Sequence, residues 1–263
     1  MPGYAWITLT TDYGLSDGFV AACHGVIARL SPGTRVLDVT HLVAPGDVPR
    51  GAAVLAQAVP HLPPAVHVAV VDPGVGTARR GIAVETPGGL LVGPDNGLLP
   101  WAADALGGPV AAVELRVGAA AGPVSPTFHG RDVFAPAAAR FAAGLPLADA
   151  GQAIDPASLV RLPDPVLARG PDWVEAEVLT IDRFGNVQLV AAPEDLDGLG
   201  DTLLVGGVHA VRGRTFADAS SGDLVVYVDS AGRVAVAVNG GRAAVVLAVA
   251  PGDVLRLSGQ PAR

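Results

Sequence analysis

The chain has 263 residues, 50% of them apolar and 16% charged, with a net charge of −8 at neutral pH and a single cysteine. The apolar fraction excludes an intrinsically disordered chain, and the negative charge without any basic run excludes a general nucleic-acid binder. Cys23 alone allows no intrachain disulfide and favours a reducing, cytoplasmic compartment, and no apolar stretch reaches the roughly 18 residues of a membrane span.

The first 150 or so residues alternate between strand and helix patterns. Strands are predicted at 6–12, 34–41, 66–72 and 111–117, with a hairpin over 81–93. The stretch VHVAVVD (66–72) is almost continuously apolar, which is typical of a strand buried on both faces of a parallel sheet. This alternation predicts an α/β N-terminal domain with a central, mostly parallel sheet.

Two aspartates mark the expected starts of helices between these strands. Asp17 and Asp47 are each predicted to cap a helix. A further helix is expected over 98–106, and another places Phe134 and Leu145 at the two ends of one apolar face.

The second half of the sequence lacks this alternation of strand and helix patterns. Residues 152–172 hold four prolines and no clear period, and therefore look like a connection. Short β-type runs, the last of them AVVLAVA (244–250), follow between Gly, Asp and Ser, which predicts a small all-β barrel-like domain. We therefore expect an α/β domain at 1–160, a linker at 161–172 and a C-terminal β-barrel domain at 173–263.

Polar residues follow several predicted strands, where α/β domains build their sites. Asp12 is as well suited to hold a ribose diol as to cap a turn, and Asp72 faces Arg79 across a loop of small residues. His129 lies in the loop before a helix, and a lone histidine there is more often structural than catalytic.

Known cofactor and metal motifs are absent from the sequence. There is no GxGxxG after the first strand, no GxxxxGK[ST] and no GxSxG. The other histidines show no ligand spacing, so no metal site is expected. In the β-rich half, Asp182 lies at a strand end and Asn186 follows a glycine turn, so Asp182 is a further polar candidate. The polar residues at 229–230 and 239–241 are by default turn residues.

Seven motifs taken in order, TTDYG, DVTH, VDPGVGTARR, GPDNGLL, FHGRDVFAP, IDRFGNVQ and VNGG, resemble one family. It is the S-adenosylmethionine (SAM) hydroxide adenosyltransferases, or SAM hydrolases, which are related to fluorinating and chlorinating enzymes. The resemblance spans residues 6–245. It implies hydrolysis of SAM to adenosine and L-methionine by a water that attacks the ribose C5′, with no cofactor. It also implies a homotrimer with its sites at the subunit interfaces.

The resemblance also implies roles for particular residues. Asp72, Arg79 and His129 match the family's water-holding set, and Arg80 does not. Asp12 matches the acid that holds the ribose. Residues that match contacts to adenine and to the methionine end of the substrate are Asp182, Phe184, Asn186, Ser230 and Asn239; for the last two, turn chemistry remains a competing interpretation.

Three other interpretations stay open. A halogenase would use the same substrate, but the halogenating relatives lack the acid at Asp72 and the histidine at His129. A SAM- or nucleoside-binding module would not require the Asp-Arg-His set. A structural or protein-interaction role, with Asp72 and Arg79 as a buried structural ion pair, would leave His129 and the acids at several successive strand ends unexplained.

Overall fold

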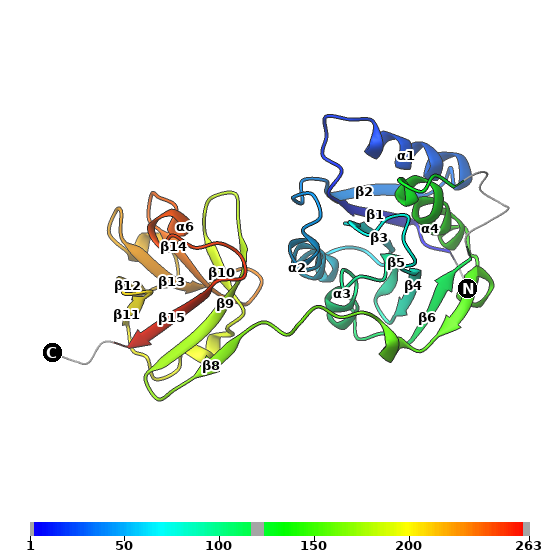
Figure 1. The fold of residues 1–263 in the computed structure, drawn as a ribbon. Helices are drawn as coiled ribbons and strands as arrows, with labels where there is room; N and C mark the ends of the chain where they lie inside the picture. The colour runs from blue at the N-terminus through cyan, green and yellow to red at the C-terminus, as the bar shows by residue number, and fades with distance from the viewer. Residues whose placement is uncertain (1–2, 117–123, 260–263) are drawn as a thin grey trace. The chain divides into compact units, whose positions relative to one another are not determined.

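The computed structural model describes residues 3–116 and 124–259, and the chain forms two units, residues 1–162 and 163–263 (Figure 1). Among the residues described, no helix is long and apolar enough to cross a membrane. Val117, expected at the end of a strand, lies outside the described residues.

The described part of the N-terminal unit contains a seven-stranded sheet in the order β2-β1-β3-β5-β4-β6-β7. Its strands are β1 (Trp6–Thr11), β2 (Arg35–Thr40), β3 (Val66–Val70), β4 (Gly81–Thr86), β5 (Gly89–Pro94), β6 (Ala111–Leu115) and β7 (Gly151–Ile154). The neighbours from β2 to β5 pair in parallel, and the pairs on the other side of β5 are antiparallel. The predicted α/β class and the β4–β5 hairpin are confirmed, in a sheet of mixed type.

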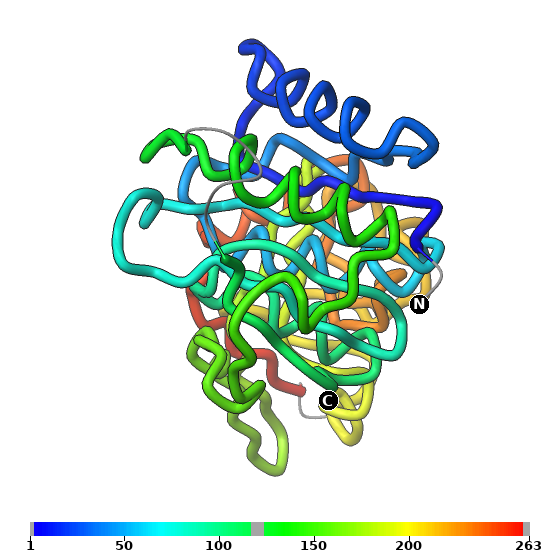
Figure 2. Tube along the Cα trace, turned by 90° about the vertical axis from the view of Figure 1, so that its right-hand side faces the viewer, coloured from blue at the N-terminus to red at the C-terminus, as the bar shows by residue number. Residues whose placement is uncertain are grey.

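Helices cover both faces of this sheet. They are α1 (Phe19–Leu30), α2 (Val48–Ala58), α3 (Pro100–Ala105), α4 (Ala135–Ala142) and the short α5 (Leu147–Ala150). α1 packs beside α4, as Figure 2 shows in dark blue and green, and their apolar residues share one core cluster. α2 and α3 pack together over a second cluster. The result is a three-layer unit with the sheet in the middle.

Strand β3 shows why the middle layer forms. Every residue of β3 is buried. Val66, Val68 and Val70 belong to the core under α1 and α4, whereas Ala69 and Val71 belong to the core under α2 and α3. Because successive side chains of a strand point to opposite faces, a continuous apolar run suits a strand covered on both sides, as the sequence predicted.

The two predicted helix caps had different outcomes. The Asp47 carboxylate accepts a hydrogen bond from the backbone N–H of Arg50 at 3.0 Å and caps α2, as expected. The prediction for Asp17 is wrong, because α1 begins at Phe19 with Gly18 at the cap position and has no side-chain cap. Asp17 lies one residue too early to reach the first free N–H groups of the helix.

The described part of the C-terminal unit contains a closed barrel of seven strands. Its strands are β9 (Trp173–Ile181), β10 (Val187–Leu189), β11 (Thr202–Val205), β12 (Val208–Arg212), β13 (Leu224–Val228), β14 (Val234–Val238) and β15 (Val254–Gly259). The pairing of β10 with both β14 and β9 closes the sheet, and β8 (Leu167–Arg169) adds to β9. Alternate residues of β9 are buried and fill the interior. The predicted barrel-like domain is confirmed.

Four elements in and after the predicted connection differ from the sequence-based expectation. The predicted connection 152–172 contains most of β7 and all of β8, each of which pairs with a regular strand. The run AVVLAVA, predicted as a strand, begins within the short helix α6 (Ala243–Val246), and β15 was not predicted at all. A short apolar run carries no period by which strand and helix can be told apart.

Candidate active site

A pocket of about 320 Å³ opens at the carboxyl ends of β1 and β3. Its lining includes Asp12, Asp72 and His129, three of the residues that the sequence predicted for a site. Asp12 directly follows β1, and Asp72 follows β3 by two residues. Neighbouring parallel strands end at the same edge of a sheet, and this edge is where α/β proteins bind their ligands.

Asp72, Arg79 and His129 form one hydrogen-bonded chain. The Arg79 Nε–H lies 3.0 Å from each carboxylate oxygen of Asp72, and Nη2 of Arg79 also donates to Oδ2. The same Nη2 lies 2.7 Å from Nδ1 of His129. The side chains of Arg79 and Asp72 are only 12% and 4% exposed, so water screens this charge pair poorly. The structure thus brings the three predicted residues together.

The loop from Asp72 to Arg79 is held in shape by its own hydrogen bonds. The N–H of Val75 donates to the carbonyl of Asp72 at 3.2 Å, and the Thr77 hydroxyl donates to the carbonyl of Gly74 at 2.7 Å. Gly76 has φ +78°, and a Cβ there would come within 2.5 Å of the carbonyl oxygen of Pro126. Gly76 therefore allows this loop to pack against the segment that leads to His129.

The surroundings of His129 favour its neutral form. Burial and the Arg79 guanidinium lower the pKa of His129, and the carboxylates of Asp72 and Asp132 oppose this shift only in part. Because a guanidinium has donors and no acceptor, Nδ1 of His129 must accept the hydrogen bond from Arg79. In the neutral ring the proton is then on Nε2.

Arg80 points to different partners. Its Nε donates to Oδ2 of Asp95 at 2.8 Å, and its Nη2 donates to the backbone carbonyl of Ser158 at 2.7 Å. Arg80 and Asp95 are not among the residues that line the pocket. Of the two arginines, Arg79 is therefore the one whose aspartate partner lines the pocket.

Asp12 is positioned by the segment after β2. Its Oδ2 accepts a hydrogen bond from the backbone N–H of Gly46 at 2.9 Å. Gly46 has φ +75°, a conformation that favours glycine, and it also lines the pocket. One carboxylate oxygen of Asp12 is thus engaged in holding the loop.

Tyr13 lines the same pocket and was not predicted. Its ring meets Phe128 edge-on, with ring centres 5.6 Å apart, and burial raises the pKa of its hydroxyl. A Cβ at position 130 would come within 2.0 Å of the Tyr13 oxygen, so Gly130 makes room for it. The signal available in the sequence was an aromatic residue next to an acid at a strand end.

The predicted residues of the C-terminal unit fall into separate turns. In the β9–β10 turn, the Asp182 carboxylate accepts hydrogen bonds from the N–H of Phe184 at 2.8 Å and from the side-chain amide of Asn186 at 2.8 Å. The ring of Phe184 is 69% exposed. Ser230 lies in the turn before β14 and Asn239 follows that strand, so these two are at opposite ends of β14.

Asn239 has a structural partner. Its side-chain amide donates to the carbonyl of Ala219 at 2.8 Å, which agrees with the turn interpretation. Ser230 is exposed and follows Asp229, whose carboxylate accepts hydrogen bonds from the N–H groups of Ala231 and Arg233 at 2.9 and 3.0 Å. The structure groups Asp182, Phe184 and Asn186, and does not gather Ser230 and Asn239 at one place.

Comparisons with known proteins cover both units. Residues 7–151 match the family model of the SAM hydroxide adenosyltransferase N-terminal domain, and residues 176–256 match that of the C-terminal domain. The (R)-S-adenosyl-L-methionine hydrolase of Salinispora arenicola is 66% identical over 98% of this chain and 99% of its own length. A more distant relative, the fluorinase of Actinoplanes sp., is 30% identical over 89% of this chain and 90% of its own.

The fold has a solved counterpart. The crystal structure of an uncharacterized conserved protein from Thermotoga maritima matches with a TM-score of 0.89 and 35% sequence identity. The match covers 96% of this chain and 99% of the other.

Proposed function

This chain belongs to the SAM hydroxide adenosyltransferase family, and we propose that it hydrolyses S-adenosyl-L-methionine to adenosine and L-methionine. The observation that carries the proposal is the hydrogen-bonded chain of Asp72, Arg79 and His129 in and behind the wall of the pocket. Full-length similarity to a protein named (R)-S-adenosyl-L-methionine hydrolase supports the same substrate.

The chemistry of the substrate decides what the site must supply. The sulfonium of S-adenosyl-L-methionine leaves as a neutral thioether, so the leaving group needs no general acid. Water forms a bond to the ribose C5′ while the C5′–S bond breaks, and one proton is released for each adenosine and methionine formed. The enzyme therefore has to hold one water in line with the C5′–S bond and keep other water away.

Arg79 and Asp72 supply the charge at the water. The Arg79 guanidinium stabilises the negative character that grows on the attacking oxygen as its proton leaves. Asp72 fixes the orientation of Arg79 through the two-oxygen contact with Nε. Since the pair is mostly buried, its field on the pocket is stronger than it would be in bulk water.

His129 orients the water and does not accept its proton in this arrangement. Its Nδ1 already accepts from Arg79, and Nε2 of the neutral ring carries the hydrogen. Nε2–H can donate to the oxygen of the water and leave a lone pair of that oxygen free for C5′. Of the three side chains, only Asp72 then keeps acceptor capacity for the departing proton, because each carboxylate oxygen has a second lone pair.

Asp12 holds the ribose. A carboxylate can accept two hydrogen bonds from a cis-diol, and one oxygen of Asp12 is already anchored by the N–H of Gly46. This contact fixes the position of C5′ relative to the water-holding residues across the same pocket.

Hydrolysis fits the site better than halogenation. The similarity to a fluorinase raises halide as a competing nucleophile. Asp72 at the pocket would repel an anion, whereas it assists the deprotonation of water. The neutral His129 adds a donor that a water molecule can use.

We also propose that the chain works as a homotrimer, in which the β9–β10 turn of a neighbouring subunit completes each site. Asp182 and Asn186 shape that turn through their mutual hydrogen bond at 2.8 Å. The turn presents the exposed ring of Phe184, which is suited to stack on adenine. Ser230 and Asn239 are proposed as weaker contacts of the same unit.

The proposed reaction needs no cofactor, since the substrate carries its own activated leaving group. The single cysteine, Cys23, is buried in the core and takes no part in it. A chain with one free buried thiol suits the reducing cytoplasm, where we place this activity.

The test is to incubate the purified protein with S-adenosyl-L-methionine, with and without excess chloride or fluoride, and to identify the products by liquid chromatography and mass spectrometry. Adenosine and methionine in equal amounts, at a rate insensitive to halide, are expected. A 5′-halogenated adenosine would make the chain a halogenase. Bound but unconverted substrate would make it a binding protein.

A further inference from the structure

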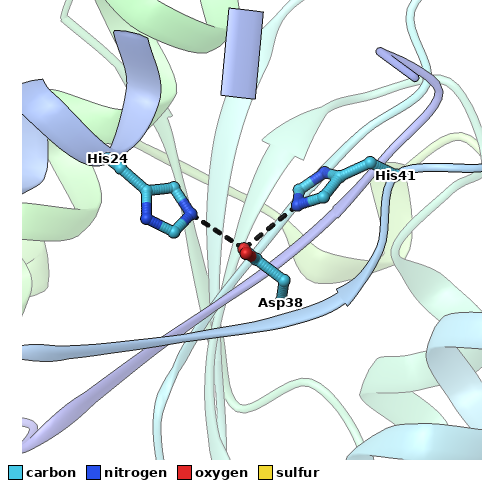
Figure 3. A group of neighbouring side chains, drawn as sticks. All are labelled: His24, Asp38 and His41. Carbon is cyan, nitrogen blue, oxygen red and sulfur yellow. Dashed lines mark hydrogen bonds and ion pairs between the residues drawn. The ribbon is translucent and has the colours of Figure 1, made fainter. Parts of the chain in front are cut away.

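A second group of polar side chains lies at the end of strand β2, outside the lining of the pocket. His24 comes from α1, Asp38 from β2, and His41 directly follows β2. Figure 3 shows both imidazole rings pointing at one carboxylate oxygen of Asp38. Nε2 of His24 lies 2.9 Å from that oxygen and Nε2 of His41 lies 3.0 Å from it. The spacing of these residues in the sequence gives no sign of this cluster.

One nitrogen of the cluster lacks a hydrogen bond. The side chain of His41 is only 3% exposed, and among the residues described its Nε2 has no hydrogen-bond partner despite its closeness to Asp38. Buried polar atoms in native proteins almost always have a partner. Nε2 of His41 is therefore a buried polar atom that needs a hydrogen-bond or metal partner.

The other nitrogen of His41 is already fixed. Its Nδ1 lies 2.8 Å from the hydroxyl oxygen of Thr11. Histidines that bind metals through one ring nitrogen usually donate the other N–H to a neighbouring oxygen, which sets the tautomer and the ring orientation. With the hydrogen on Nδ1, Nε2 of His41 presents a lone pair to the cluster.

We propose that His24, Asp38 and His41 bind a zinc ion through Nε2, Oδ1 and Nε2, with water as the fourth ligand. Two imidazoles and one carboxylate are a donor set that zinc accepts in three-ligand protein sites. All three donor atoms lie within 4.8 Å of one another. Zinc bonds of about 2.0–2.2 Å in a tetrahedron place neighbouring ligand atoms roughly 3.3–3.6 Å apart, so each imidazole nitrogen has to move away from the Asp38 oxygen by only a few tenths of an ångström.

The site is accessible and its ligands can adjust. The side chains of His24 and Asp38 are 36% and 39% exposed, in contrast to buried His41. An ion can therefore enter from solvent on the side of His24 and Asp38 while His41 provides a preset anchor. Zinc would replace an arrangement in which one carboxylate oxygen lies 2.9 Å from Nε2 of His24 and 3.0 Å from Nε2 of His41.

A zinc ion here would hold in place the loop that carries Asp12. It would join α1 to the end of β2, and Thr11, whose hydroxyl contacts Nδ1 of His41, directly precedes Asp12. The backbone carbonyl of His41 also accepts the N–H of Gly14 at 2.7 Å. The ion would thus stabilise this corner of the sheet and take no part in the chemistry at C5′.

The experiment measures zinc itself, on an untagged full-length chain stripped with a chelator. Calorimetric titration with ZnCl₂ and elemental analysis after gel filtration should give one zinc per wild-type chain. Asp38→Asn and His24→Ala should each weaken binding at least tenfold, and His61→Ala, which removes an exposed histidine outside the cluster, should not. Circular dichroism confirms that each variant is folded.

Thermal melting provides a second readout. Saturating zinc should raise the melting temperature of the wild type and of His61→Ala by at least about 3 °C, and should leave Asp38→Asn and His24→Ala unchanged. Absence of stoichiometric zinc in the wild type would overturn the proposal. So would binding by Asp38→Asn and His24→Ala as tight as in the wild type, because the ion would then sit elsewhere.

Discussion

Two adjacent arginines each form an ion pair with an aspartate whose side chain is almost fully buried. The two arginines differ in the further partner that each one contacts. Asp72–Arg79 continues to the ring of His129 at a pocket. Asp95–Arg80 continues to the backbone carbonyl of Ser158 and ties the sheet to the segment that follows β7.

The difference shows that a buried ion pair alone is a weak indication of function, since such pairs also serve structure. What distinguishes the Asp72–Arg79 region is a third partner able to handle a water and direct contact with a cavity. The predictions below separate the two regions, from the largest expected effect to the smallest.

Replacing each arginine by alanine should separate catalysis from stability. Arg79→Ala should lower kcat about 10³-fold, because it removes a donor aimed at charge that develops in the transition state. Arg80→Ala should leave kcat within a few-fold and lower the free energy of unfolding by about 2 kcal/mol, less than for a fully buried pair, since Arg80 is 27% exposed. Steady-state kinetics and urea unfolding of both variants check this. Equal decreases of kcat in Arg79→Ala and Arg80→Ala would contradict a catalytic role for Arg79 that Arg80 lacks.

His129 should matter through its hydrogen bonds. His129→Ala should lower kcat about 10²-fold, and His129→Asn should retain more activity because an amide can accept from Arg79 and donate to water. The double variant Arg79→Ala/His129→Ala should lose less than the product of the single losses, since both act on the same water. Multiplicative losses would contradict a shared water.

Asp12 should affect binding of the substrate more than its conversion. Asp12→Asn keeps the shape and an oxygen for the N–H of Gly46 but loses the charge that favours a diol, so KM should rise about tenfold. The effect on kcat should be smaller, and Asp17→Asn, at an exposed position in the following loop, serves as the control. A loss confined to kcat would place Asp12 among the water-holding residues instead.

The pH profile should respond to Asp132. The mechanism requires neutral His129, whose pKa lies below its ordinary value of 6.5, so kcat/KM should be flat at neutral pH and fall only as the pH drops through that lowered pKa. Asp132 raises the pKa of His129, and Asp132→Asn should therefore move the acid limb to still lower pH. Asp149→Asn, an exposed change on α5, should leave the limb in place. A shift of the acid limb toward higher pH in Asp132→Asn would contradict the expectation that Asp132 raises the pKa of His129.

Much of the N-terminal unit could be predicted from the sequence because its signals are local. The run 66–72 predicts β3 from burial on both faces, and Asp47 predicts the start of α2 from cap chemistry. β15 and α6 were missed because short apolar runs acquire their state from pairing partners far away in the chain, such as β9 and β11 for β15.

The residues of the candidate site also divide into those with a local signal in the sequence and those without one. Asp12 and Asp72 could be predicted from their places at strand ends. Arg79 and His129 were also candidates from the sequence, but their role with Asp72 as a water-holding set came only from the family resemblance. Tyr13 and the cluster of His24, Asp38 and His41 could not be predicted, because their meaning depends on which strands and helices become neighbours.

The most direct test of the account is the origin of the oxygen in adenosine. The enzyme is incubated with S-adenosyl-L-methionine in ¹⁸O-labelled water, and the masses of the products are measured by mass spectrometry. Attack of a held water on C5′ predicts one ¹⁸O atom in the 5′-hydroxyl of adenosine, none in methionine, and at least a hundredfold slower labelling in Arg79→Ala. Unlabelled adenosine, or undiminished labelling in Arg79→Ala, would contradict the role assigned to Asp72, Arg79 and His129.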